Sequence, residues 1–412
     1  MNKEHLRDIL LLQNDFTPKE IVERTLSNKL SSLAKTPFII IISGIRRCGK
    51  STLINTLRGK DAYYVNFDDE RFIDFTVNDF QMLYELLMEL FGEKKIFLFD
   101  EIQVIWGWER FVRRLHDDDN KIYVTGSNAS MLSRELGTHL TGRNISLSLF
   151  PFSFKEFLRE KKFELTINLT SVEKSKIKKF FSEYFLEGGF PEFLSTKKEE
   201  YLKNIYENII YRDIITRYNL KKEKPLKEVV VYLASNIAKE LSFNTLKKLS
   251  GLTSATTIKE YLSYLENSYL LFSLNKYDFS LKKQVYANKK IYFIDNALAR
   301  IIGFRSSEDK GRLLENLVFI ELKRRNKELY YHKAKKECDF LIKEGLKITE
   351  AIQVCYELTQ DNEKREMDGL LEAMSIHKLK EGLLLTYDQE KEIKIQNKLI
   401  KVLPIWKWLL KE

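Results

Sequence analysis

Strand-like apolar segments alternate with amphipathic stretches along the first third of the chain. Each apolar segment is only a few residues long, and the stretch at residues 77–91 places its apolar residues at helical spacing. Short continuous apolar runs are typical of strands that are buried on both faces. Their alternation with helices predicts a parallel α/β sheet over residues 36–150. The expected strands lie at residues 38–42, 62–67, 95–103, 121–128 and 145–149.

Four other regions differ from this core in pattern. Residues 1–35 are expected to form a helical lead-in, and residues 151–235 a mostly helical lid or linker region. Residues 236–300 hold two helices around a glycine turn, followed by strand-like segments, which predicts a winged-helix-like domain. Residues 305–412 start with an amphipathic helix and continue with strands, which predicts a second α/β domain.

The loop after the first strand has the pattern G-x-x-x-x-G-K-S at residues 44–51. Glycines let a backbone wrap closely around phosphate oxygens, and the N-terminus of the following helix favours negative charge. In such a P-loop the lysine, Lys50, bridges the β- and γ-phosphates, and the hydroxyl of Ser51 ligates Mg²⁺. The sequence therefore predicts ATP and Mg²⁺ as cofactors. The residues expected to line the nucleotide are Gly44, Ile45, Arg46, Arg47, Cys48, Gly49, Lys50, Ser51 and Thr52.

In the third expected strand, four apolar residues at 96–99 are followed by two acids, Asp100 and Glu101. We expect Asp100 to hold Mg²⁺ through water and Glu101 to polarise the attacking water. A buried strand that ends in two solvated acids would show the same pattern. Because these acids lie one βα unit after the P-loop, their position favours the ATPase interpretation.

Polar residues after the next two strands complete the predicted ATPase site. Asn128 or Ser127 is expected to sense the γ-phosphate, and the sequence does not separate them, since Ser127 could also cap the next helix. Arg143, with Arg134 as second candidate, is placed to act as an arginine finger that neutralises charge on a neighbouring subunit's γ-phosphoryl group. A surface salt bridge is the alternative for this arginine.

With these motifs the chain resembles the prokaryotic AAA+ ATPases that carry a nuclease-like C-terminal domain of unknown function. The resemblance runs nearly end to end and implies an AAA+-type ATPase. By analogy Arg212 would approach the nucleotide, although a place on a helix surface is the simpler interpretation. The matching segments are residues 44–51, 96–103, 125–130, 141–143 and 149–157.

The predicted second helix of the winged-helix-like region begins with small polar residues. If this helix reads DNA, those residues face a groove. Winged helices also mediate protein contacts or domain packing, so the pattern alone does not decide the partner. The residues concerned are Thr253, Ser254, Thr256, Thr257 and Lys259.

The C-terminal region has the layout of a PD-(D/E)XK nuclease, with an acid on a helix, an acid on a strand and a third acid on the next strand. The matching residues are Glu315, Asp339 and Glu350, and Gln353 is expected to replace the lysine. Such carboxylates gather around Mg²⁺ to activate water. Because glutamine lacks the lysine's charge, a degenerate fold used for binding or assembly is favoured over an active nuclease.

The composition of the chain indicates which partners to expect and in which compartment the protein works. The formal net charge of +10 makes a polyanion, DNA first, an expected partner alongside a protein partner or a homo-oligomer. The 3 cysteines have no metal-site spacing, and no apolar run is long enough for a membrane span, which predicts a cytoplasmic protein. The leading hypothesis is an ATPase that acts on DNA or a partner. A slow nucleotide-gated switch and an ATP-controlled, Mg²⁺-dependent nuclease are the alternatives.

Overall fold

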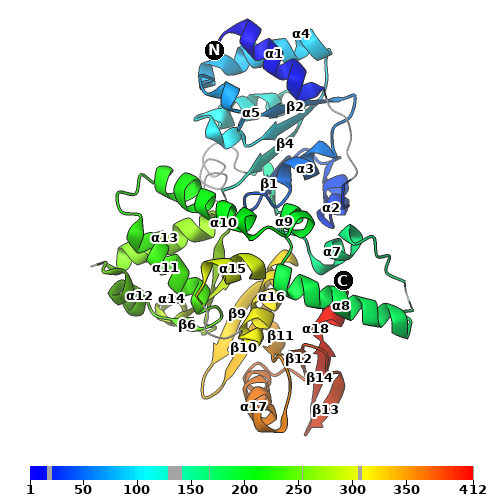
Figure 1. Ribbon diagram of the computed structural model, residues 1–412, viewed down its shortest axis with the longest axis vertical. Coiled ribbons are helices and arrows are strands. Elements are labelled where there is room, and N and C mark those ends of the chain that lie inside the picture. The colour runs from blue at the N-terminus through cyan, green and yellow to red at the C-terminus, as the bar shows by residue number, and fades with distance from the viewer. Residues whose placement is uncertain (16–20, 129–141, 167, 253, 305–308, 412) are drawn as a thin grey trace. The chain divides into compact units, whose positions relative to one another are not determined.

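The computed structural model spans residues 1–412 and describes all of them except 16–20, 129–141, 167, 253, 305–308 and 412 (Figure 1). The chain divides into two compact units. The first comprises Met1–Phe150 with Asn267–Tyr269, and the second comprises Pro151–Glu266 with Leu270–Glu412.

The first unit is built on a five-stranded sheet with strand order β2-β3-β4-β1-β5, in which every neighbouring pair is parallel. All five residues of β1 are buried, which explains why isoleucine stands at each of its first four positions. The strands are β1 (Ile39–Ser43), β2 (Ala62–Asn66), β3 (Ile96–Asp100), β4 (Lys121–Gly126) and β5 (Asn144–Ser148).

Helices connect these strands and cover the sheet. The α-helices are α1 (Lys3–Asn14), α2 (Leu26–Leu33), α3 (Lys50–Asn55), α4 (Phe80–Phe91) and α5 (Trp108–Asp117). Three short 3₁₀ turns follow β2 and β3, namely η1 (Glu70–Phe72), η2 (Val77–Asp79) and η3 (Ile102–Val104).

Helix α1 belongs to the core of this unit. Its residues Leu6, Ile9 and Leu10 lie in the same buried cluster as Phe97 and Phe99 of β3. The predicted lead-in and the P-loop sheet therefore share one hydrophobic core.

The end of α1 also covers the open edge of the sheet. The side-chain amide of Asn14 donates to the carbonyl of Tyr64 at 3.0 Å and accepts from its N–H at 3.2 Å. Gln13 makes the same pair of bonds with Asn66, at 3.1 and 2.8 Å. Because β2 is an edge strand, these amides satisfy backbone groups that would otherwise face solvent.

The second unit begins with helices. These are α7 (Phe154–Glu160), α8 (Ser171–Glu187), α9 (Pro191–Thr196), α10 (Glu199–Asn208), the π-helical η4 (Ile209–Thr216) and α11 (Lys224–Ser235). Gly188 and Gly189 lie between α8 and α9. A Cβ atom on Gly189 would lie 2.3 Å from the carbonyl oxygen of Phe152, so the backbone approaches too closely there for any other residue.

A small antiparallel sheet with strand order β6-β8-β7 follows. Its strands are β6 (Glu240–Leu241), β7 (Leu271–Asn275) and β8 (Lys289–Phe293). The helices beside and after it are α12 (Phe243–Ser250), α13 (Ala255–Asn267), α14 (Leu281–Tyr286) and α15 (Asn296–Ile302).

The last part of the second unit is a six-stranded mixed sheet with order β13-β14-β12-β11-β10-β9. Helix α17 packs on β10, β11 and β12, and their shared core includes Leu341 and Leu370. The strands are β9 (Glu328–Lys333), β10 (Glu337–Glu344), β11 (Lys347–Val354), β12 (Glu381–Thr386), β13 (Lys391–Ile395) and β14 (Lys398–Pro404), and the helices are α16 (Lys310–Arg324), α17 (Gln360–Ile376) and α18 (Ile405–Leu409).

Among the described residues, none of the helices has both the length and the apolar character that crossing a bilayer requires.

Candidate functional site

The P-loop joins β1 to α3, and its shape depends on two glycines. A Cβ atom on Gly44 would lie only 2.1 Å from the carbonyl oxygen of Leu149. Gly49 has φ +100° and precedes α3 as its N-cap, a left-handed conformation that glycine adopts without strain. Both glycines are therefore needed for the loop to close against the end of β5 and to start the helix.

Lys50 is buried and points back into the loop. Its ammonium group donates to the carbonyls of Gly44 at 3.1 Å and Ile45 at 3.2 Å, and lies 3.4 Å from a carboxylate oxygen of Glu101. Burial is the largest influence and lowers the pKa of Lys50, but the charge of Glu101 together with Cys48 and Asp100 outweighs it, so the pKa is raised. The lysine is therefore charged, at the place where phosphate oxygens are expected.

Asp100 ends β3 and is 1 % exposed. The hydroxyl of Tyr64 donates to its carboxylate at 3.0 Å, and the hydroxyl of Thr125 donates to the other oxygen. Burial, followed by the charge of Glu101, raises the pKa of Asp100, while a hydrogen bond with Ser51 lowers it.

Ser51 and Asp100 are the two expected Mg²⁺ ligands, and the structure brings them together. A hydroxyl and a carboxylate are the hard oxygen ligands that Mg²⁺ prefers, so this pair fits the ion. When bound, Mg²⁺ would neutralise charge on the phosphates and favour the carboxylate form of Asp100.

Glu101 is held in place from several sides. The backbone N–H and the hydroxyl of Ser127 each donate to its carboxylate at 3.1 Å, and the amide of Gln103 donates to the same oxygen at 2.5 Å. Burial would raise the pKa of Glu101, but Lys50 and these hydrogen bonds lower it. Glu101 is therefore an oriented carboxylate. Of the two sensor candidates, Ser127 contacts Glu101 directly, whereas Asn128 is fully buried at the end of β4.

Arg143 lies at the amino ends of the strands, whereas the P-loop lies at their carboxyl ends. It immediately precedes β5, and its carbonyl accepts from the N–H of Ile39, the first residue of β1. Because β1 and β5 run in parallel and the P-loop follows the end of β1, Arg143 cannot reach the nucleotide of its own subunit. Its guanidinium pairs with Asp117 on α5. The second candidate, Arg134, lies outside the described residues.

Arg24 is a residue of this site that the sequence analysis missed. It is 6 % exposed and donates to the carbonyl of Cys48 at 2.9 Å and to that of Phe150 at 2.6 Å. A Cβ atom on Gly49 would lie 3.2 Å from its guanidinium. A single arginine in a polar segment gives no sequence signal for such a role, because its partners lie 24 and 126 residues away.

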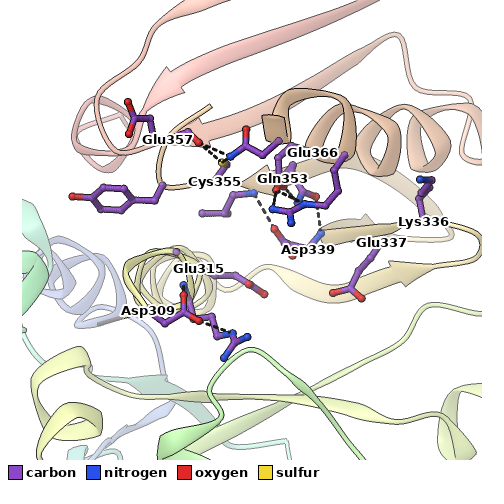
Figure 2. Close-up of a pocket in the computed structure, with 15 residues that line it drawn as sticks. Asp309, Glu315, Lys336, Glu337, Asp339, Gln353, Cys355, Glu357 and Glu366 are labelled. Carbon is purple, nitrogen blue, oxygen red and sulfur yellow. Dashed lines mark hydrogen bonds and ion pairs between the residues drawn. The ribbon is translucent and has the colours of Figure 1, made fainter. Parts of the chain in front are cut away.

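The second unit contains a cavity of about 530 Å³ at the predicted nuclease-like site (Figure 2). It is lined from four elements: the start of α16, the start of β10, the end of β11 and the start of α17. The charged and thiol residues among those lining it are Asp309, Arg312, Glu315, Lys336, Glu337, Asp339, Cys355, Glu357, Arg365 and Glu366.

Lys290 of β8 lies among the carboxylates of this site. Its ammonium nitrogen is 2.8 Å from an oxygen of Glu337, 3.0 Å from one of Glu315 and 3.1 Å from one of Asp339. The hydroxyl of Tyr292, also on β8, donates to Glu315 at 2.7 Å. Sequence reasoning missed Lys290 because it lies 25 residues before the nearest of the predicted acids.

Glu350 is not part of this cluster, and its assignment to the site is wrong. It is exposed and absent from the cavity wall. Glu350 and Gln353 are three residues apart on β11, and successive side chains of a strand point to opposite faces, so the two cannot face one region.

Gln353 of β11 and Cys355, the residue just after β11, line the cavity beside Asp339. Gln353 accepts from the N–H of Asp339 at 3.3 Å and donates to Glu366 at 2.8 Å. A nuclease-type Glu-x-Lys pair facing Asp339 would therefore occupy positions 353 and 355. Both the acid and the lysine are replaced there. In the part of the chain that is described, no three His, Cys, Asp or Glu side chains are arranged to hold a metal ion.

The other predicted contact residues lie on the surface of the second unit. Ser254, Thr256 and Lys259 are exposed at the start of α13, and Thr257 is half-buried. Thr253 lies outside the described residues. Arg212 is exposed on η4.

Three families match successive parts of the chain. An AAA domain matches residues 36–158, and two domains of unknown function, DUF8612 and DUF4143, match residues 178–308 and 310–408.

Two relatives match over most of their length. The uncharacterized protein MJ1544 of Methanocaldococcus jannaschii is 38% identical over 395 residues, covering 90% of this chain and 88% of the relative. An uncharacterized protein of Haemophilus influenzae is 34% identical over 401 residues, covering 93% and 96%. A solved structure of AMPPCP-bound DnaA from Aquifex aeolicus matches 62% of this chain and 90% of its own, at 17% identity and a TM-score of 0.25, a value too low to support an inference. The chain therefore belongs to the same family as these two relatives, and residues 36–158 form its P-loop AAA domain.

Proposed function

We propose that this protein is a Mg²⁺-dependent AAA+-type ATPase whose nucleotide state controls its binding to DNA or to a protein partner. The observation that carries the proposal is the convergence of Lys50, Ser51, Asp100 and Glu101 at the carboxyl ends of β1 and β3. Lys50 would bind the β- and γ-phosphates. Ser51 and Asp100 would hold Mg²⁺, and Glu101 would orient the attacking water.

Binding of nucleotide changes the partners of Lys50 in this mechanism. In the structure the ammonium group contacts the carbonyls of Gly44 and Ile45 and the carboxylate of Glu101. Phosphate oxygens carry more charge than carbonyl oxygens and make stronger hydrogen bonds to an ammonium group. Nucleotide would therefore draw Lys50 away from Glu101 and leave that carboxylate free to act on water.

Arg143 would complete the site of a neighbouring subunit. The position of Arg143 at the opposite edge of its own sheet supports action in trans. Such a role requires at least a dimer, and the ion pair with Asp117 would have to open or rearrange on assembly.

The small sheet of the second unit supports the partner-binding part of the proposal. The order β6-β8-β7, with α12 and α13 inserted between β6 and β7, is the arrangement expected of a winged helix. We assign DNA or protein contact to the exposed start of α13, where Ser254, Thr256 and Lys259 lie.

ATP turnover measured with and without DNA, over a range of salt concentrations, tests the proposal. We expect Mg²⁺-dependent turnover that Lys50→Ala abolishes and that Lys60→Ala, which removes an exposed lysine of the same unit, leaves unchanged. Strong stimulation by DNA would indicate a motor. ATP-dependent DNA binding with little turnover would indicate a switch. Absence of ATP binding in the wild-type protein would contradict the proposal, and mass measurement in ATP would show whether subunits assemble.

A further inference from the structure

The carboxylate cluster of the second unit, formed by Glu315, Glu337 and Asp339, already has a cation. The ammonium group of Lys290 lies within 3.1 Å of one oxygen from each of these three side chains. An ammonium group has three N–H donors, so the three carboxylates use its whole hydrogen-bonding capacity. Lys290 itself is 1 % exposed, which means that no water competes for these donors.

We propose that Lys290 occupies the place that a divalent cation takes in a nuclease-like site, so that this site binds no metal and cuts no nucleic acid. Carboxylate oxygens are the hard ligands that Mg²⁺ prefers, and here one oxygen from each of three carboxylates lies 2.8–3.1 Å from a single ammonium nitrogen. Figure 2 shows Glu315, Glu337 and Asp339 reaching into the same side of the cavity from α16 and β10. Mg²⁺ would need oxygens at about 2.1 Å from its centre, in a space that the lysine nitrogen fills.

The rest of the cavity wall agrees with a site that has lost metal chemistry. The residue of β11 that faces Asp339 is Gln353, which has an amide where a nuclease would have an acid. Two residues later, Cys355 has a thiol where a nuclease would have the amine of a lysine. Burial raises the pKa of the Cys355 thiol to about 11. This thiol is therefore neutral at physiological pH and supplies no charge to a phosphate.

The basic residues of the wall do not favour a phosphate backbone either. Arg312 pairs with Asp309 at 3.1 Å, and Arg365 pairs with Glu366 at 2.6 Å. Lys336 lies 3.6 Å from Asp368. Each cation of the rim thus has an acid beside it, which reduces the positive potential that a phosphodiester would experience.

The cluster has a structural role that follows from where its members come from. Lys290 lies in the region matched by DUF8612, and the three carboxylates lie in the region matched by DUF4143. The buried ion pairs therefore tie β8 to α16 and β10. Removing one partner of such a buried group leaves an uncompensated charge and is strongly destabilising.

Binding of Mn²⁺ to the full-length protein without nucleotide tests this inference, with electron paramagnetic resonance to measure the free ion. We expect no Mn²⁺ binding that depends on Asp339 in the wild-type protein. Lys290→Met should create one new Mn²⁺ site, with affinity at least about tenfold above the wild-type background. Adding Asp339→Asn to Lys290→Met should remove the new site. Lys333→Met, which removes an exposed lysine that pairs with the same Glu337, serves as matched control and should gain nothing.

Two results would overturn the inference. One is Mn²⁺ binding by the wild-type protein that Asp339→Asn abolishes. The other is a folded Lys290→Met variant that binds no more Mn²⁺ than the wild type. If Lys290→Met fails to fold, Mn²⁺ binding by the wild type is compared with that by Asp339→Asn, which leaves Lys290 unchanged. Equal binding by the two proteins supports the inference. Incubation of the wild type with plasmid and Mn²⁺ should leave the plasmid intact.

Discussion

The ammonium group of Lys50 and the carboxylate of Glu101 form an ion pair across the nucleotide site, with nitrogen and oxygen 3.4 Å apart. Burial acts against the charge of both members, and the partner's charge is the largest influence that opposes it: with help from neighbouring groups it raises the pKa of Lys50 and lowers the pKa of Glu101. The ion pair also joins the residue expected to bind phosphate to the expected catalytic base in one direct contact.

Replacing Glu101 with glutamine should separate these two roles. Glu101→Gln keeps the size of the side chain but cannot polarise water, so we expect turnover to fall by about 10²-fold while ATP stays bound. Phosphate release, together with the nucleotide that remains on the protein after desalting, measures both effects. Glu93→Gln changes an exposed acid of the same unit and should turn over normally. Normal turnover by Glu101→Gln would remove its assigned role.

Replacing Arg24 should loosen the P-loop. Arg24→Ala leaves the carbonyls of Cys48 and Phe150 without their donor, and each unsatisfied buried group costs about 1–3 kcal/mol. We expect a lower melting temperature and several-fold weaker ATP binding, measured by calorimetry. Arg7→Ala, which removes an arginine exposed on α1, should change neither. A variant of Arg24 with wild-type affinity for ATP would show that this contact serves stability alone.

Mixing two inactive variants should test the position of Arg143. Arg143→Ala is expected to lower turnover by about 10³-fold if it removes an arginine finger. A mixture of Arg143→Ala with Lys50→Ala should recover part of the activity, because one interface then combines an intact P-loop with an intact arginine. Asp117→Asn breaks the same ion pair and should remain active. If Asp117→Asn and Arg143→Ala lose activity equally and the mixture does not recover, Arg143 serves only the salt bridge.

The stability of the second unit should depend on pH through Asp295. Burial raises the pKa of Asp295 to about 6 from 3.8, although it accepts hydrogen bonds from the N–H groups of Gly189 and Leu298. Between these two values the folded protein holds a proton that the unfolded chain has released. The free energy of unfolding should therefore fall as pH rises through this window, by up to about 3 kcal/mol, and stay lower above it.

Asp295→Asn should remove this pH dependence. Hydrogen exchange of α15, compared between variant and wild type at the same pH, measures the effect. Relative to wild type, the variant should gain stability as pH rises from about 4 to about 7. Asp278→Asn, on the segment before α14, serves as control. A difference between variant and wild type that is the same at every pH would contradict the assignment.

Contiguous motifs made the P-loop site predictable. The residues of the P-loop and the acids after β3 lie within short segments whose spacing alone fixes their geometry, and the structure brings Lys50, Ser51, Asp100 and Glu101 together. Parallel strands also place their carboxyl ends on the same side of a sheet. For that reason the P-loop and the acids at the end of β3, which lie about 50 residues apart, could be predicted to meet.

Contacts between distant segments could not be predicted in the same way. Arg24 and Lys290 make side-chain hydrogen bonds to residues far along the chain. The sequence around each of them shows no motif that would identify it as a site residue. Glu350 shows a different failure, because the phase of β11 was misjudged by one residue. In a strand, an error of one residue moves a side chain to the other face.

The place of α1 in the first unit affects how the protein is made. Leu6, Ile9 and Leu10 leave the ribosome before the other residues of the cluster that buries them, which extends to Val124 of β4. The edge strand β2 likewise needs the amides of Gln13 and Asn14 from that same helix. During synthesis the apolar face of α1 therefore stays uncovered until more than a hundred further residues have emerged.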